Sequence, residues 1–210
     1  MTFICQIWTL YRSNDRSKVV DLKSRRITTT NQALIIIDIQ NDYFEGGAMP
    51  LNNPMTVANK AKELLTFYRE SQKPIIHIQH LAARPELKFM LEGTHGQKIH
   101  SSVEPKHGER IITKNYPNSF AGTELSEVLD ELSITHVVLA GMMTHMCISS
   151  TARSALEYGL NTTIAHDACA TCDLSIFEQI IPAKEVHLTA LAEVSSIANI
   201  VSSEDIIWVS

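Results

Sequence analysis

The fold of this chain is most constrained by short, wholly apolar segments that recur between stretches with helical spacing. The first of them, Ala33–Asp38 (ALIIID), has five apolar residues in succession before its aspartate. An uninterrupted apolar run indicates a strand that is buried on both faces, as in a parallel sheet covered by helices. Further strands are predicted at Ile75–Gln79, Arg110–Thr113, Thr135–Ala140, Asn161–His166 and Ala198–Val201.

Helices are predicted between these strands. Pro54 stands where a first helical residue belongs, and apolar residues follow it at helical spacing as far as Tyr68. The other helices are expected at Leu125–Leu132, Cys147–Tyr158 and Pro182–Glu193, with a terminal turn at Ser203–Ile207. This alternation predicts an α/β fold of three layers, in which helices cover both faces of a mostly parallel, six-stranded sheet.

The bulk properties are those of an ordinary globular protein. The chain has 210 residues, of which 44% are apolar and 20% charged, and its formal net charge is −5. The negative charge argues against general nucleic-acid binding, and no apolar run approaches the roughly 18–20 residues that a membrane span needs. Four irregularly spaced cysteines do not form a secreted disulfide framework, so a reducing, cytoplasmic location is expected.

Residues 1–30 are expected to form an N-terminal extension, flexible or an extra element, ahead of one domain over residues 31–210. Basic residues outnumber acids in the extension, where only Asp15 and Asp21 oppose six lysines and arginines. A basic segment that contains Ser and Thr is typical of an organelle-targeting presequence. A frayed extension, an extra edge element and a wrongly chosen start codon are the alternatives.

Three chemically distinctive residues follow or end predicted strands. Asp38 ends the first strand, Lys114 follows the third, and Cys147 follows the fourth within AGMMTHMCISS (Ala140–Ser150). The carboxyl ends of parallel strands meet at the edge of the sheet where α/β proteins bind ligands. Each residue alone has a structural explanation, as a cap, a solvated lysine or a core thiol. An acid, a cation and a nucleophile together favour covalent amide hydrolysis.

The thiol is expected at the N-terminus of a helix that is rich in small residues. Unpaired backbone N–H groups and the helix dipole favour an ionised sulfur at such a position. The prediction for Cys147 is therefore a thiolate beside a carboxylate and an ammonium group.

Three segments carry a resemblance to a known family. They are ALIIIDIQNDYFEGGAMPL (Ala33–Leu51), GERIITKNYPNSFAGTEL (Gly108–Leu125) and HVVLAGMMTHMCISSTARSALEYGLNTTIAHDACAT (His136–Thr171). In this order and at this spacing they resemble the isochorismatase-like cysteine hydrolase superfamily, over about residues 31–205. The resemblance implies an isochorismatase-like, Rossmann-like fold.

The resemblance also implies the roles of individual residues. It implies a catalytic triad of Asp38, Lys114 and Cys147, and an oxyanion hole formed by the backbone N–H groups of Met143 and Cys147. The family's non-proline cis peptide corresponds to Met142–Met143 here. In the implied mechanism Asp38 takes the thiol proton, Cys147 forms a thioester, and Lys114 holds the carboxylate and keeps the thiolate charged.

Substrate-binding residues are harder to assign than the triad. Phe44, Tyr116 and Phe120 lie near the triad in sequence and are expected to wall the pocket, although core packing explains Phe120 equally well. Gln40 either binds substrate or anchors its loop. Substrate identity cannot be read from the loop Asp42–Met49 or from the long connection that follows the second strand.

No metal or other cofactor is expected. His77 and His80 flank the end of the second strand, where the metal-bearing nicotinamidases place an Asp-x-His pair that this chain lacks. His145 is expected to be structural or to line the rim of the site. Cys169 and Cys172 have redox-motif spacing, but the default interpretation is two ordinary thiols.

The sequence therefore predicts a cysteine hydrolase that cleaves a small amide, carbamoyl or ureido compound through a thioester. The alternatives are a vinyl-ether hydrolase of the isochorismatase type, which needs the acid but no thiol, and a non-catalytic binding protein on the same scaffold. No G-x-G-x-x-G follows the first strand, which argues against a dinucleotide-binding protein. A homo-oligomer, either dimer or tetramer, is expected because members of the family commonly associate.

Overall fold

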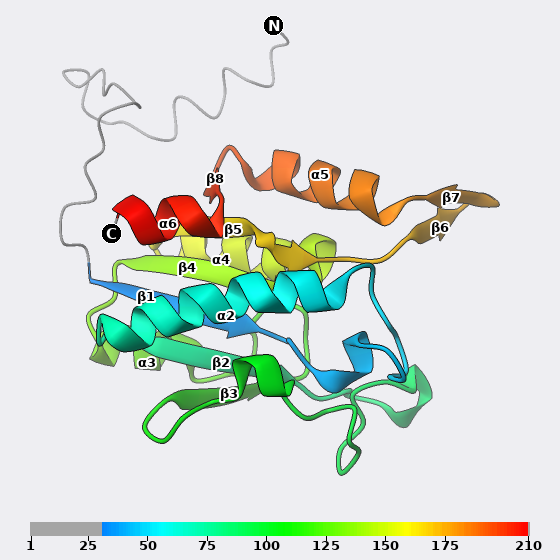
Figure 1. Cartoon of the computed structure of the whole chain (residues 1–210), viewed down its shortest axis with the longest axis horizontal. Coiled ribbons are helices and arrows are strands. Elements are labelled where there is room, and N and C mark those ends of the chain that lie inside the picture. Colours follow the sequence, from blue (N-terminus) through cyan, green and yellow to red (C-terminus); the bar gives the residue numbers. More distant parts are fainter. Residues whose placement is uncertain (1–30, 210) are drawn as a thin grey trace, which may run out of the picture.

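The structure is a computed structural model that describes residues 31–209. Its centre is a six-stranded sheet in which every pair of neighbouring strands is parallel (Figure 1). In spatial order the strands are β3 (Arg110–Lys114), β2 (Ile75–His80), β1 (Gln32–Ile37), β4 (His136–Met142), β5 (Asn161–Ala170) and β8 (Asn199–Val201). The predicted six-stranded α/β architecture is confirmed.

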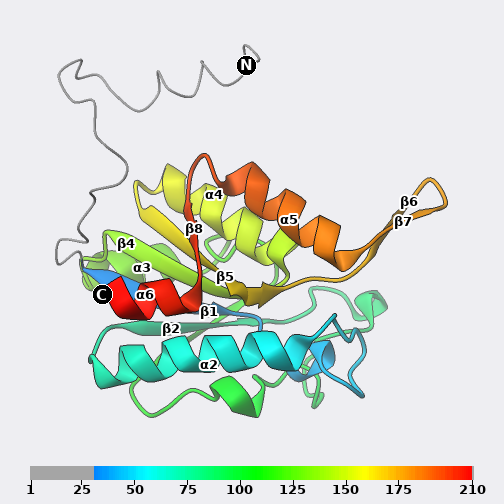
Figure 2. The same ribbon diagram turned by 45° about the horizontal axis from the view of Figure 1, so that its top comes forward.

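Helices cover both faces of this sheet and make the three layers (Figure 2). One face packs against α2 (Pro54–Glu70) and α6 (Ser203–Val209). The other packs against α3 (Leu125–Glu131), α4 (Ser149–Glu157) and α5 (Ala183–Val194). Alternate residues of β1 enter the two cores, which explains why this strand is apolar at consecutive positions.

The order of the strands creates a topological switch point in the middle of the sheet. From β1 the chain proceeds outward through β2 to β3, then returns to β4 beside β1 and proceeds outward the other way. The connections after β1 and β4 therefore diverge at the carboxyl edge between these two strands. Open α/β sheets bind ligands at such a switch point. Asp38 follows β1, and the segment that carries Cys147 follows β4.

The helical segment that carries Cys147 begins three residues earlier than predicted. Thr144–Ile148 forms a π-helical turn, and α4 continues from it at Ser149. Three short 3₁₀ turns also lie in the connections, at Asn41–Tyr43, Pro85–Leu87 and Ser101–Val103. The predicted terminal turn is the helix α6.

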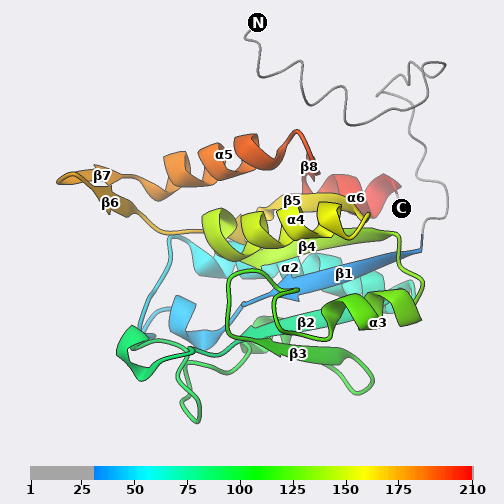
Figure 3. The same cartoon turned by 180° about the vertical axis from the view of Figure 1, so that it is seen from behind.

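Two β features were not predicted. β5 continues past His166 to Ala170, because a register shift lets its end pair with the end of β4. A hairpin of β6 (Leu174–Ile176) and β7 (Gln179–Ile181) projects from the carboxyl edge (Figure 3). Its turn residues Phe177 and Glu178 have positive φ angles, a conformation for which Asn or Gly is the usual sequence signal.

An ion-pair network joins α2 to the start of β3. The carboxylate of Glu109 accepts hydrogen bonds from Arg69 Nε at 2.6 Å, from the Lys106 main-chain N–H at 2.9 Å and from His77 Nε2 at 2.8 Å. Burial raises the pKa of Glu109, but bonds from Arg69 and the other donors lower it more, to about 2. The ionised Glu109 therefore stabilises the folded protein above the ordinary pKa of a carboxyl group. This stabilisation is lost as the pH falls toward 2 and the carboxylate takes up a proton.

The predicted extension of residues 1–30 lies outside the described residues. Among residues 31–209, no helix combines the length and apolar composition that crossing a membrane requires.

Gly141 allows β4 to approach β1 directly ahead of the segment that carries Cys147. A Cβ at this position would overlap the carbonyl oxygen of Ile37, and its φ is 140°. Gly159, at the end of α4, also has a positive φ, of 74°, but open space surrounds its Cα. These two glycines separate the cost of the backbone conformation from the cost of the close approach.

We expect Gly159→Ala to lower the free energy of unfolding by about 1–2 kcal/mol, the cost of a positive φ. Gly141→Ala should lower it by a further 1–3 kcal/mol, roughly, because its methyl group collides with the β1 main chain. Urea unfolding of both variants measures the difference. Equal losses of stability would contradict the close-approach explanation.

Candidate active site

The structure brings Asp38, Lys114 and Cys147 together at the carboxyl edge of the sheet. The Nζ atom of Lys114 lies 2.7 Å from Asp38 Oδ2 and 3.2 Å from Cys147 Sγ. The side chains of Asp38 and Lys114 are 0% exposed, and Cys147 is 6% exposed. An acid, a cation and a thiol thus form one buried cluster at the switch point of the fold.

The local structure explains why the side chains of Asp38 and Lys114 meet. Asp38 has a φ of 52°, a left-handed conformation that aspartate tolerates better than most residues. Lys114 is the last residue of β3, and its side chain lies on the same face as that of Ile112. β2 separates β1 from β3, so the two residues belong to strands roughly 10 Å apart. The long stem of lysine spans this gap.

Cys147 owes its position to the π-helical turn after β4. The main-chain N–H groups of Met146 and Ile148 both donate to the carbonyl of Met143, at 3.1 and 3.2 Å. The peptide bond between Met142 and Met143 is cis, as the family resemblance implied. The turn begins at Thr144, whose hydroxyl donates to the Ala170 carbonyl at 3.2 Å and so ties the turn to β5.

The prediction that the resting sulfur is a thiolate is wrong. Burial raises the pKa of Cys147, and the charge of Asp38 raises it further; the opposing effect of Lys114 is smaller. The thiol is therefore protonated at neutral pH. Burial also acts to lower the pKa of Lys114, but attraction to Asp38 and Cys147 outweighs it, so the ammonium group stays charged. The resting cluster consists of an ion pair beside a neutral thiol.

The buried carboxylate contacts both the ammonium group and the thiol. Asp38 Oδ2 lies against the ammonium group of Lys114 as an ion pair, and the Cys147 thiol hydrogen-bonds to the same carboxylate. Asp38 also acts electrostatically on the Cys147 thiol. A buried carboxylate that is hydrogen-bonded to a thiol is the arrangement that a general base requires.

The side-chain amide of Gln40 is fully used within the loops. It donates to the carbonyls of His80 and Gln97, at 2.8 and 2.7 Å, and accepts from the His80 main-chain N–H at 2.8 Å. Of the two roles considered for this residue, these bonds support loop anchoring.

The three aromatic residues expected to wall a pocket lie in different surroundings. Phe44 is buried with its ring stacked on His100 at 3.7 Å. Phe120 is buried in the same apolar cluster as Cys147, and its ring stacks on Tyr158 at 4.7 Å. Tyr116 is 60% exposed, and its carbonyl accepts a hydrogen bond from Lys114 at 3.1 Å. Of the three, Tyr116 hydrogen-bonds to the triad through its main chain, and Phe120 shares a core cluster with Cys147.

Sequence reasoning missed the role of Asp42. Its carboxylate accepts hydrogen bonds from the main-chain N–H groups of Ala48 and Met90, and Gly96 lies against it where any Cβ would clash. Asp42 thus joins the loop after β1 to the long connection after β2. The signal available in the sequence was weak, because an acid in a Gly-rich loop has many uses.

The candidate metal-binding histidines do not converge. Three residues apart on one strand, His77 and His80 point to opposite faces of the sheet. His77 bonds to Glu109, and the Nδ1 atom of His80 lies 3.2 Å from the ammonium group of Lys114. Within residues 31–209, no group of three or more His, Cys, Asp or Glu side chains could hold a metal ion.

The remaining candidates have structural contacts. His145 Nδ1 is 2.5 Å from the hydroxyl of Thr171. Cys169 is a buried free thiol, and Cys172 is a partly exposed one whose sulfur lies 3.8 Å from that of Met143. Neither cysteine is in a disulfide, which agrees with the default interpretation.

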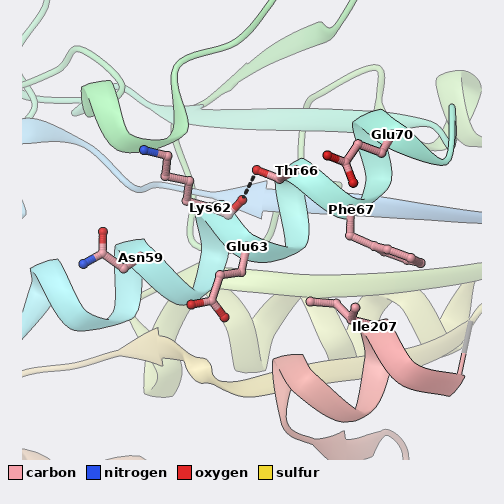
Figure 4. A pocket seen from close by; sticks show the side chains of 7 residues that line it. All are labelled: Asn59, Lys62, Glu63, Thr66, Phe67, Glu70 and Ile207. Carbon is pink, nitrogen blue, oxygen red and sulfur yellow. Dashed lines mark hydrogen bonds between the residues drawn. The ribbon is translucent and has the colours of Figure 1, made fainter.

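A groove away from the triad lies along α2 beside α6 (Figure 4). Its volume is about 630 Å³. Its lining residues are Asn59, Lys62, Glu63, Thr66, Phe67, Glu70 and Ile207. The charged side chains among them are exposed. Its lining includes no buried acid, base or nucleophile, so the cluster of Asp38, Lys114 and Cys147 is the candidate site.

Comparisons with known proteins agree with the geometry. The Isochorismatase domain model matches residues 32–205. The isochorismatase family protein YddQ of Bacillus subtilis is 42% identical over 165 residues, which span 79% of this chain and 92% of that protein. The maleamate amidohydrolase of Pseudomonas putida is 31% identical over 150 residues, covering 64% of this chain and 70% of that protein.

A solved structure extends the agreement to three dimensions. The putative isochorismatase hydrolase of Oleispira antarctica superposes with a TM-score of 0.83 at 38% identity, and the match covers 86% of this chain and 98% of that one. The sequence and the fold thus agree over nearly the whole described region. This chain belongs to the isochorismatase family of hydrolases, whose members include amidohydrolases that act on carbon–nitrogen bonds.

Proposed function

We propose that this protein is a cysteine amidohydrolase that cleaves a small amide, carbamoyl or ureido compound through a thioester intermediate. The observation that carries the proposal is the buried contact of Lys114 with both Asp38 and Cys147. The similarity to an enzyme named maleamate amidohydrolase supports an amide substrate.

In the first half-reaction the carboxylate of Asp38 takes the Cys147 proton as the sulfur attacks the substrate carbonyl. Because the resting thiol is protonated, proton transfer accompanies the attack rather than preceding it. The charge that develops on the carbonyl oxygen would be bound by the main-chain N–H groups of Met143 and Cys147. Each such donor contributes about 3–4 kcal/mol to transition-state stabilisation.

The proton on Asp38 then passes to the leaving amine as the carbon–nitrogen bond breaks, which forms the thioester and completes the first half-reaction. In the second half-reaction water attacks the thioester, and Asp38 takes a proton from it. The carbon–sulfur bond breaks, the acid leaves, and the sulfur takes the proton back from Asp38. Lys114 stays protonated throughout, because its charge is paired with Asp38 at rest and lies beside the sulfur when negative charge appears there.

The thiol separates this proposal from the vinyl-ether alternative. Hydrolysis of a vinyl ether needs an acid at the position of Asp38 but has no use for a nucleophilic sulfur. The contact between Lys114 and Cys147 Sγ, at 3.2 Å, therefore favours the amidohydrolase.

Assembly and location remain predictions. A homo-oligomer has the support of the projecting hairpin, where Ile176, Phe177 and Ile180 are 52%, 89% and 69% exposed. Such apolar exposure is common where a partner binds. Light scattering of the purified chain distinguishes monomer, dimer and tetramer.

The free thiols in the described part of the chain agree with the predicted cytoplasmic location.

Replacing the nucleophile should abolish turnover. In a screen of small amides, carbamoyl and ureido compounds for ammonia release, Cys147→Ala should lower kcat/KM at least about a thousandfold. Cys172→Ser, which changes a free thiol outside the triad, is the matched control and should retain activity. Full turnover by Cys147→Ala would favour the vinyl-ether mechanism instead.

The pH dependence of thiol alkylation tests the resting state. Because the pKa of Cys147 is raised, its labelling by iodoacetamide should still increase above pH 9. Asp38→Asn removes a group that raises this pKa and leaves Lys114, which lowers it. That variant should label faster at pH 8, about tenfold for each unit by which the pKa falls, although its turnover is lost.

Mass spectrometry of the peptide that contains Cys147 measures these rates, with Cys172 in the same molecule as the reference thiol. Slower labelling of Cys147 in Asp38→Asn than in the unmodified protein would show that the carboxylate does not hold the proton on the sulfur.

A further inference from the structure

The ring of His80 contacts the ammonium group of Lys114. It is the last residue of β2, the strand that Lys114 must cross to reach Asp38. The Nδ1 atom of its ring lies 3.2 Å from Lys114 Nζ, and the residue is buried. Its place in the sheet therefore makes it a direct neighbour of the group that contacts both the acid and the nucleophile.

Separate contacts are made by the main chain and by the ring of His80. The amide of Gln40 bonds to both the N–H and the carbonyl of His80, at 2.8 Å each. The ring of Phe89 lies parallel to the imidazole, with 6.1 Å between the ring centroids. The bonds of Gln40 fix the main chain of His80, and Phe89 lies against its ring, so the amide of Gln40 has an indirect connection to Lys114.

The donors and acceptors around Lys114 Nζ indicate the role of Nδ1 of His80. The ammonium group has three N–H donors. Three atoms lie at hydrogen-bond distance and geometry, namely Cys147 Sγ, the carbonyl oxygen of Tyr116 and Nδ1 of His80, while Asp38 Oδ2 contacts the group as an ion pair. A nitrogen facing a donor must offer its lone pair, so the imidazole is neutral and carries its proton on Nε2.

The surroundings of the ring keep it neutral. Burial lowers the pKa of His80, and the charge of Lys114 lowers it further, while Asp38 acts in the opposite direction. A second proton on the ring would place two cations 3.2 Å apart in a buried site. The same proximity to an ammonium group argues against metal binding at Nδ1.

We infer that His80 is a positioning residue whose neutral imidazole accepts a hydrogen bond from Lys114 and so holds the ammonium group between the Asp38 carboxylate and the Cys147 sulfur. The effect on turnover rests on the proposed function, whereas the effect on the thiol does not. Lysine is a flexible side chain with freely rotating donors, so its direction depends on the acceptors around it. His80 supplies the acceptor on the β2 side.

Two variants test whether the hydrogen-bond acceptor of His80 is what matters. In His80→Asn the side-chain oxygen can take the place of Nδ1 and accept the same hydrogen bond. In His80→Leu the volume is similar but no acceptor remains. We expect His80→Leu to lower kcat by about ten- to a hundredfold with KM changed less than about twofold, since misplaced groups act on the chemical step. His80→Asn should recover most of that loss.

Alkylation of Cys147 by iodoacetamide gives a readout without substrate. A less well-held Lys114 lowers the thiol pKa less, so the labelling profile of His80→Leu should move to higher pH. The expected rate at pH 8 is about three- to tenfold lower than in the unmodified protein, and His80→Asn should label at nearly the unmodified rate. An unchanged profile in His80→Leu, or equal behaviour of the two variants, would overturn the inference.

The two readouts separate failure of this inference from failure of the proposed function. A shifted profile with no amide turnover in any form of the protein would reject the amidohydrolase and retain the role of His80. If neither variant folds, ¹⁵N NMR of the histidines in the unmodified protein decides the question. Nδ1 of His80 must show the shift of an unprotonated nitrogen at neutral pH, and a protonated Nδ1 would rule the role out.

Discussion

The buried ion pair between Asp38 and Lys114 is the interaction on which the rest of the site depends. Both side chains are fully buried, and a buried charge is tolerated only when it is paired. The fold meets this requirement because the strand order places β1 two strands from β3, a distance that a lysine side chain spans. The pair therefore ties the carboxyl ends of β1 and β3 together and supplies the charges of the candidate site.

The same burial determines the state of the nucleophile. A thiol next to a carboxylate in a dry site keeps its proton, and a nearby ammonium group does not fully offset that tendency. The resting protein thus holds a neutral sulfur beside an acceptor that can take its proton. Such an arrangement avoids an isolated buried thiolate, and in the proposed mechanism the sulfur ionises during attack with Lys114 already beside it.

Much of the fold could be predicted because its strands and helices have strong periodic signals. The apolar run of β1, the Pro54 start of α2 and the small residues of α4 each indicated the right element. The hairpin around Phe177 could not be predicted, since its turn residues lack the usual signal for positive φ. The start of the helical segment at Thr144 could not be predicted either, because the residue before it, Met143, is not a typical helix cap and no proline follows.

The sequence by itself determined which candidate residues meet, since Asp38, Lys114 and Cys147 stand at or just after strand ends and a parallel sheet brings such ends to one edge. Only the tertiary structure decided the protonation of the thiol, the anchoring role of the Gln40 amide and the contact of His80 with Lys114. These properties depend on how completely water is excluded and on which side chains from separate strands meet. Neither the exclusion of water nor the contacts between strands can be read from local residue spacing. Both arise from packing between segments far apart along the chain.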